Sequence, residues 1–213
     1  MPFIPDASVI LPFAVAVVIL AITPGPDMTL FVGRTLSEGR AAGLACMFGS
    51  YTGILVHTLM VTVGLSALIL ASPRAFLVLK VVGAAYLVWL AVQAVLRGSA
   101  FSPDTARRPA RPLVVNWVTG IGINLLNPKI VLFYVTFLPQ FVSAGDPHAP
   151  GKLLFLGLLS IAIAIPITTP MVLAAGRFSA LMKRNPRVMR AIDWLFAGVF
   201  SAFAVKILLA ESK

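Results

Sequence analysis

Two charged residues stand in the middle of apolar segments, where a membrane-spanning helix normally carries none. Asp27 lies in AITPGPDMTLFV (21–32), and Lys129 lies in NPKIVLFY (127–134). A charge at the centre of a spanning helix costs about 2.5–3.5 kcal/mol on insertion scales, so such residues usually face a cavity or a partner. The lysine could hold a substrate carboxylate, and the aspartate could hold an ammonium or carry a proton. The alternative is a structural ion pair between the two.

Each charge lies beside residues that interrupt a helix. Proline lacks a backbone N–H and clashes with the preceding turn, which frees carbonyl groups. Free polar backbone is tolerated at membrane depth only where it is buried in protein or lines a wet cavity. The asparagines near the second break could bind a zwitterion or simply cap the free backbone. The substrate-binding residues predicted from both breaks are Thr23, Pro24, Gly25, Pro26, Asp27, Asn124, Asn127, Pro128 and Lys129.

The two breaks form a matched pair. GPDMTLFV (25–32) aligns without gaps with NPKIVLFY (127–134), and the identical positions are Pro26 with Pro128, Leu30 with Leu132, and Phe31 with Phe133. An odd number of predicted spans separates the breaks, so the two halves must have opposite orientations. An inverted repeat with interrupted helices at matching positions indicates a secondary transporter. The simpler alternative is a pair of ordinary proline kinks.

Further polar side chains lie inside apolar segments. An unperturbed histidine titrates near neutral pH, and we predict that His57 shares a proton-coupling role with Asp27. A neutral histidine bonded to a neighbouring helix is the alternative. Thr168 and Thr169 lie between two prolines, where they either line the pathway or satisfy backbone that the prolines expose.

The composition requires these residues to be positioned by membrane-spanning helices. Of 213 residues, 59% are hydrophobic and 11% are charged, against about 25% charged in soluble domains. We therefore predict an all-α, polytopic membrane protein, built as two inverted three-helix repeats whose first and fourth helices are broken. Its six transmembrane helices are predicted at about 9–36, 41–71, 75–97, 113–141, 152–176 and 190–210, in a first repeat (1–97), a basic cytoplasmic linker (98–112) and a second repeat (113–213).

The basic residues indicate the orientation. The net charge is +10, but these residues cluster in short loops beside apolar segments, which excludes a nucleic-acid partner and favours cytoplasmic loops. One side collects Arg34, Arg40, Arg97, Arg107, Arg108, Arg111, Arg177, Lys183, Arg184, Arg187 and Arg190. The other side has Arg74, Lys80, Lys152, Lys206 and Lys213. The positive-inside rule then places both termini outside the cytoplasm, and the first segment, which has no basic residue before it, is predicted to be retained.

These features resemble a known family. TPGP (23–26) in the first predicted helix, NPK (127–129) in the fourth, and six spans in a chain of this length are similar to the LysE/RhtB family of bacterial amino-acid exporters. The resemblance covers essentially the whole chain; TPGP is fairly specific in this setting, whereas NPK alone is weak. It implies a multi-pass carrier of the bacterial inner membrane that exports amino acids or close derivatives and is driven by the proton gradient.

Other functions fit the sequence less well. A thiol–disulfide carrier needs a cysteine pair, but Cys46 is the only cysteine, and Asp27 is the only carboxylate deep in a span, so no enzyme is predicted. Hard cations need several oxygen ligands, and Lys129 would repel them, so neither a metal site nor a cofactor is expected. A channel or an exporter for another small solute or ion stays open, because broken helices also build filters.

The same lack of a second deep carboxylate favours neutral substrates, such as homoserine, threonine or a branched-chain amino acid. A side-chain ammonium or guanidinium would need an anionic partner of its own. The sequence leaves open which amino acid is carried, which ion is coupled, and whether the protein forms a homo-oligomer.

Overall fold

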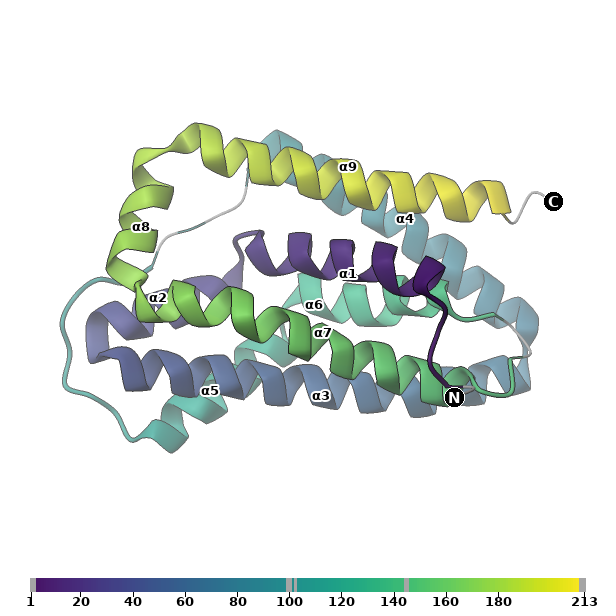
Figure 1. Cartoon of the computed structure of the whole chain (residues 1–213), viewed down its shortest axis with the longest axis horizontal. Helices are drawn as coiled ribbons and strands as arrows, with labels where there is room; N and C mark the ends of the chain where they lie inside the picture. Colours follow the sequence, from purple (N-terminus) through teal and green to yellow (C-terminus); the bar gives the residue numbers. More distant parts are fainter. Residues whose placement is uncertain (1–2, 99–100, 102, 144–145, 211–213) are drawn as a thin grey trace.

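The computed structural model describes residues 3–98, 101, 103–143 and 146–210, and all regular structure in them is helical. The elements are α1 (Ala7–Ile22), α2 (Pro26–Glu38), α3 (Arg40–Ala71), α4 (Pro73–Arg97), α5 (Leu113–Leu125), α6 (Pro128–Leu132), a π-helix (Phe133–Phe137), a 3₁₀ turn (Leu138–Phe141), α7 (Ala149–Leu173), α8 (Ala175–Arg184) and α9 (Pro186–Ala210). Most of them run along the long axis of the molecule (Figure 1).

The first break separates α1 from α2, which are bent by 47°. Thr23 and Gly25 are both extended, so the helix stops after Ile22 and restarts at Pro26. Proline suits the first position of a helix, because the missing N–H would have no partner there. The prolines of this stretch therefore end one helix and begin the next.

The second break separates α5 from α6, and the helices on its two sides are bent by 55°. Pro128 again begins the new helix, and the Asn127 side chain caps it by accepting a hydrogen bond of 3.0 Å from the Lys129 backbone N–H. Unlike regular α2, this segment continues from α6 into a π-helix and then a 3₁₀ turn. Such π segments often occur at functional sites.

The predicted fold class is confirmed. By length and composition, three helices of the described part can cross a membrane: Arg40–Gly64 within α3, Ala149–Leu173, and Pro186–Val205 within α9. Counting each bent pair as one span raises the number to five. The remaining predicted span, 75–97, falls in α4, whose apolar run Val81–Leu96 is shorter. The division into two repeats and a linker stays a prediction.

The bent pairs run in opposite directions between the two ends of the bundle (Figure 1). The helix termini around Gly39, the linker and α8 lie at one end, and the start of α1 and the end of α9 lie towards the other (Figure 1). The loops predicted to be cytoplasmic thus share one end of the molecule; Lys213 lies outside the described residues. The short helix α8, which runs across the bundle, was not predicted, because its sequence is basic and amphipathic rather than uniformly apolar.

Two helices, α3 and α5, cross with almost no space between them. A Cβ added to Gly49 would lie 2.0 Å from the Trp117 carbonyl oxygen, and one added to Gly120 would lie 2.1 Å from the Cys46 carbonyl oxygen. Small residues allow this close approach of backbones in membrane proteins. The crossing brings α3 directly against the helix that leads into the second break.

Candidate functional site

A cavity of about 70 Å³ lies where the two breaks meet. It is several times larger than the roughly 10–15 Å³ that one water molecule needs. Of the predicted substrate-binding residues, Thr23, Gly25, Asp27, Asn124 and Lys129 line it. Pro24, Pro26, Asn127 and Pro128 do not; the prolines shape the backbone of the breaks, and the asparagine contacts a lining residue from behind. The two halves of the chain therefore build one polar site.

The Lys129 ammonium group reaches across to the first break. Its Nζ donates to the carbonyl oxygens of Thr23 at 2.8 Å and Leu20 at 3.2 Å. In a continuous helix the Leu20 carbonyl would pair with the N–H of residue 24, but Pro24 has none. A lysine from the second break thus satisfies backbone that the first break exposes. A Cβ added to Gly25 would lie 3.2 Å from this Nζ, so the glycine leaves the ammonium its space.

The Asp27 carboxylate is held mainly from the second break. Its Oδ1 accepts hydrogen bonds from Ser50 Oγ at 2.9 Å and Asn124 Nδ2 at 3.2 Å, and its Oδ2 accepts from Asn127 Nδ2. Within the described part of the chain, Asp27 and Lys129 therefore do not form the simple ion pair that was considered. Each charge is bound by uncharged polar groups, largely those of the opposite break.

The helix ends reinforce this arrangement. Asp27 lies in the first turn of α2, where the helix dipole favours a negative charge. The Lys129 ammonium lies against the last carbonyls of α1, where the dipole favours a positive charge. The cavity thus presents one anionic and one cationic group to a solute.

The rest of the cavity wall is apolar except for several hydroxyl groups. Tyr51 is hydrogen-bonded to Thr168, and Tyr134 to Ser160 at 2.5 Å. All four residues line the cavity, together with Ser50. Of these five residues, the sequence pattern indicated only Thr168, whose hydroxyl also donates to the Ala164 carbonyl at 3.0 Å. Neither proline frees this carbonyl, so the bond does not show the predicted repair of proline-exposed backbone. The other hydroxyls come from regular helix and from the π-helix.

His57 lies behind the cavity wall. Its ring is buried and stacks on Tyr134, with centroids 5.8 Å apart and ring planes 21° from parallel. Its Nε2 has no hydrogen-bond partner among the described residues. The predicted proton-coupling histidine is thus separated from the solute space by one aromatic ring.

The sequence comparisons indicate a family of membrane translocators. A sequence model described as LysE type translocator matches residues 18–211. The chain belongs to the LysE translocator family. A membrane-transport family excludes the enzyme alternatives and confirms the resemblance that TPGP and NPK indicated.

Three relatives of this LysE translocator match it over nearly the whole chain. A homoserine/homoserine lactone efflux protein of Salmonella typhimurium is 31% identical over 92% of each chain. A leucine efflux protein of Klebsiella pneumoniae is 28% identical over 95% of each chain. An uncharacterized membrane protein of Vibrio cholerae is 32% identical over 98% of this chain and 99% of its own. No solved structure matches significantly.

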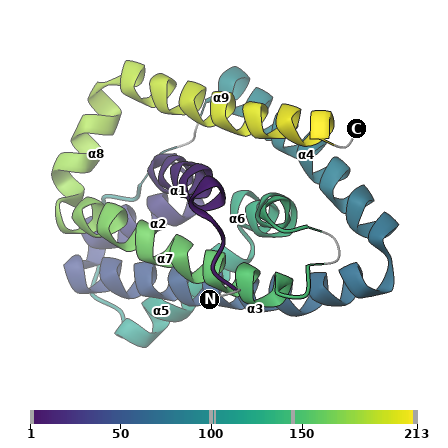
Figure 2. The same ribbon diagram turned by 45° about the vertical axis from the view of Figure 1, so that its right-hand side comes forward.

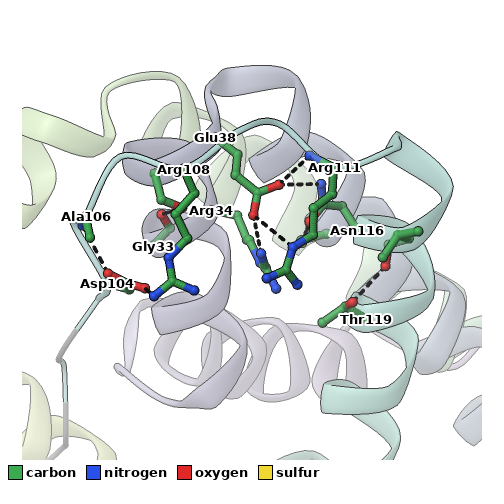
Figure 3. A network of polar contacts seen from close by, with 12 residues as sticks. Gly33, Arg34, Glu38, Asp104, Ala106, Arg108, Arg111, Asn116 and Thr119 are labelled. Atoms are coloured by element: carbon green, nitrogen blue, oxygen red, sulfur yellow. Dashed lines mark hydrogen bonds and ion pairs between the residues drawn. The ribbon is translucent and has the colours of Figure 1, made fainter.

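The translocator also has a polar network at the end of α2, away from the cavity (Figure 3). Glu38 pairs with Arg34 of the same helix, accepts 3.0 Å and 3.2 Å hydrogen bonds from Arg111 N and Asn116 Nδ2, and lies 3.7 Å from Arg111 Nε. The Glu38 side chain is fully buried. The network joins the helix after the first break to the linker and to α5. Sequence reasoning missed it, because Glu38 stands at the edge of a predicted span.

Proposed function

We propose that this translocator exports neutral amino acids or close derivatives across the bacterial inner membrane in exchange for protons. The observation that carries the proposal is the pairing of one cationic and one anionic group, contributed by opposite breaks, in a single cavity. A zwitterion can satisfy both groups at once, whereas a simple anion or cation leaves one unsatisfied. This favours an amino-acid carrier over a channel for another solute or ion.

In the bound state, the substrate carboxylate accepts hydrogen bonds from the Lys129 ammonium, and the substrate ammonium contacts Asp27. Both groups have existing partners that can be exchanged for a substrate: backbone carbonyls for the lysine, and amide and hydroxyl donors for the aspartate. Because these partners are uncharged, each residue keeps its charge available for a solute of opposite charge.

The remaining cavity wall supports a neutral substrate side chain. Apolar residues such as Val17, Ile54 and Phe133 accompany the hydroxyl groups of Tyr134 and Ser160. Among the described residues that line the cavity, Asp27 is the one carboxylate, and a basic substrate side chain would need a second one. Two relatives are named as efflux proteins for homoserine and for leucine, which are amino acids with uncharged side chains.

Proton coupling is assigned to Asp27 and His57. A carboxylate that binds the substrate ammonium releases it on protonation, which makes proton entry and substrate exit alternative events. His57, with a buried ring nitrogen that lacks a partner among the described residues, can exchange a proton from behind Tyr134. We also propose that both chain termini lie outside the cytoplasm.

The test is an export assay in a bacterium that lacks its own exporters. Cells that express the chain are challenged with dipeptides that release homoserine, threonine, leucine or lysine internally. Tolerance should rise for the neutral residues and not for lysine, and Lys129→Ala should abolish the gain at an equal amount of membrane-inserted protein. Unchanged tolerance to every amino acid would refute the exporter, and tolerance to lysine alone would refute the neutral substrate.

A further inference from the structure

A second feature lies outside the cavity, at the end of the molecule that carries the linker and α8. Between Ala175 and Arg190 the chain has five basic residues and no acidic one: Arg177, Lys183, Arg184, Arg187 and Arg190. All five are exposed. Because α8 runs across the bundle (Figures 1 and 2), these charges gather at one end instead of spreading along a span.

A groove of about 410 Å³ is embedded in this basic region. Lys183 and Arg190 line it, together with Phe101, Met182 and Met189. Asp193 lies at its base, but this residue is buried and has an interaction partner of its own. The charge that the groove presents to solvent is therefore positive, which suits an anionic group such as a phosphate.

An apolar groove of about 330 Å³ adjoins the basic one, between α4 and α9. Val92, Leu96 and Trp194 line it and are 46%, 72% and 59% exposed. Arg190 lies where the two grooves meet, because it lines the basic groove while its Nη1 donates at 2.9 Å to the carbonyl of Val95, a lining residue of the apolar groove. The basic groove thus continues into the apolar groove, which runs between α4 and α9.

We propose that these two grooves bind one anionic phospholipid molecule. Its phosphate contacts Lys183 and Arg190, and an acyl chain lies between α4 and α9 against Trp194. A soluble phosphate would use only the basic groove, and a second protein chain would use only the apolar one. The pairing of charge with a membrane-facing apolar groove fits a lipid with both parts. The site is separate from the substrate cavity and does not depend on its assignment.

A substitution at Gly198 tests whether the apolar groove binds the acyl chain. Gly198 lines the apolar groove, and a Cβ added there would meet no atom within 4 Å. Gly198→Leu should therefore fill the groove without disturbing the packing. Gly64→Leu is the matched control, because Gly64 of α3 is also exposed and also has open space around its Cα. Both changes replace a helical glycine with the same side chain.

The basic groove is tested with Lys183→Gln and with the double variant Lys183→Gln/Arg190→Gln. The single variant keeps the hydrogen bond from Arg190 to the Val95 carbonyl. A lower lipid preference in that variant therefore cannot come from loss of this bond. Arg74→Gln is the control, since Arg74 is an exposed basic residue at the beginning of α4, far along that helix from the groove.

The readout is quenching of Trp194 fluorescence by brominated lipid, with Trp89 and Trp117 replaced by phenylalanine. The full chain is reconstituted in phosphatidylcholine vesicles that contain a minor fraction of brominated phosphatidylglycerol, and then in vesicles where that fraction is brominated phosphatidylcholine. The anionic lipid should quench more strongly. Each removed charge should lower the preference about fivefold, and Gly198→Leu should abolish it, while both controls retain it.

Four results would overturn the proposal. The first is equal quenching by the two lipids in the wild-type protein. The second is loss of the preference in Gly64→Leu or Arg74→Gln, which would make it a general property of the surface. The third is a preference that inorganic phosphate removes but Gly198→Leu does not, which would leave a free-anion site. Self-association that Gly198→Leu disrupts, with lipid preference unchanged, would likewise assign the groove to a second copy of the chain.

Discussion

The Lys129 ammonium is hydrogen-bonded to the Thr23 carbonyl oxygen at 2.8 Å, across the boundary between the two halves of the chain. The lysine follows a proline of one break, and the carbonyl belongs to the backbone that the other break leaves without a helical partner. Asp27 has the reciprocal relation with Asn124 and Asn127. Each break therefore contributes one charged side chain, and polar groups of the other break bind that charge.

This arrangement predicts different results for deletion and reversal of the charges. Lys129→Ala should weaken substrate binding by roughly 10–150-fold, corresponding to the ~1.5–3 kcal/mol of a hydrogen bond to a charged group. The combined Asp27→Lys/Lys129→Asp variant should not restore binding, because it would place a carboxylate against the Leu20 and Thr23 carbonyls. Equilibrium binding to purified protein of equal thermal stability checks both. Full recovery in the reversed variant would mean that the two charges act only on each other.

Proton coupling should separate from substrate exchange. In vesicles, Asp27→Asn should abolish substrate accumulation driven by a pH gradient, because a side-chain amide cannot take up and release the coupled proton. Exchange of labelled for unlabelled substrate should persist at a reduced rate. His57→Gln should lower coupling with less effect on affinity, since the ring lies behind Tyr134. Asp104→Asn, in the exposed linker, is the control. Normal coupling in both site variants would remove these residues from the proton path.

The Glu38 network should contribute to stability rather than to substrate affinity. Glu38→Gln removes its ion pairs with Arg34 and Arg111 from a buried position and should destabilise the protein by about 1–3 kcal/mol. Asp104→Asn breaks an ion pair with Arg108 in which both side chains are about half exposed, and should cost about 0–1 kcal/mol. Thermal unfolding in detergent measures the difference. Equal melting temperatures for the two variants would contradict the assigned role.

The loop before α7 predicts a specific acid sensitivity. The hydrogen bond from Lys152 Nζ at 2.6 Å, aided by the His148 backbone N–H, lowers the pKa of Asp146. Because the folded-state pKa is the lower one, this stabilisation is present above the unfolded pKa, about 4, and is lost as pH falls through the folded value. Asp146→Asn should therefore reduce thermal stability at neutral pH, and the difference from wild type should shrink in acid. A difference independent of pH would exclude this titration.

The orientation is tested with reporter fusions. A reporter that is active only outside the cytoplasm should be active after Lys213 and silent when inserted near Arg108. This follows from the basic residues of the linker and α8, which share one end of the molecule opposite the chain termini (Figure 1). The reverse pattern would invert the protein in the membrane.

The sequence was sufficient for the parts of the fold and site that depend on local chemistry. Prolines identified both breaks, because their missing N–H has the same effect in any helix. The high insertion cost of a charge identified Asp27 and Lys129. Ser50, Tyr134 and Ser160 could not be found in this way, because hydroxyl side chains are common in regular membrane helices and only packing turns them towards the cavity. The helix α8 was missed for a related reason, since a short amphipathic segment resembles a polar loop.

The close crossing of α3 and α5 constrains how the cavity can open. At Gly49 and Gly120 the backbones touch without intervening side chains, so these helices cannot slide past each other without a steric clash. We therefore expect this crossing to keep Ser50 and Asn124 at a constant separation. If the proposed transport proceeds by alternating access, we expect the movement in elements hinged at the breaks, α1 with α2 and α6 with the π-helix. We expect such a motion to separate Lys129 from Thr23 or Asp27 from Asn127, so that opening the cavity would also break contacts of the two proposed substrate-binding charges.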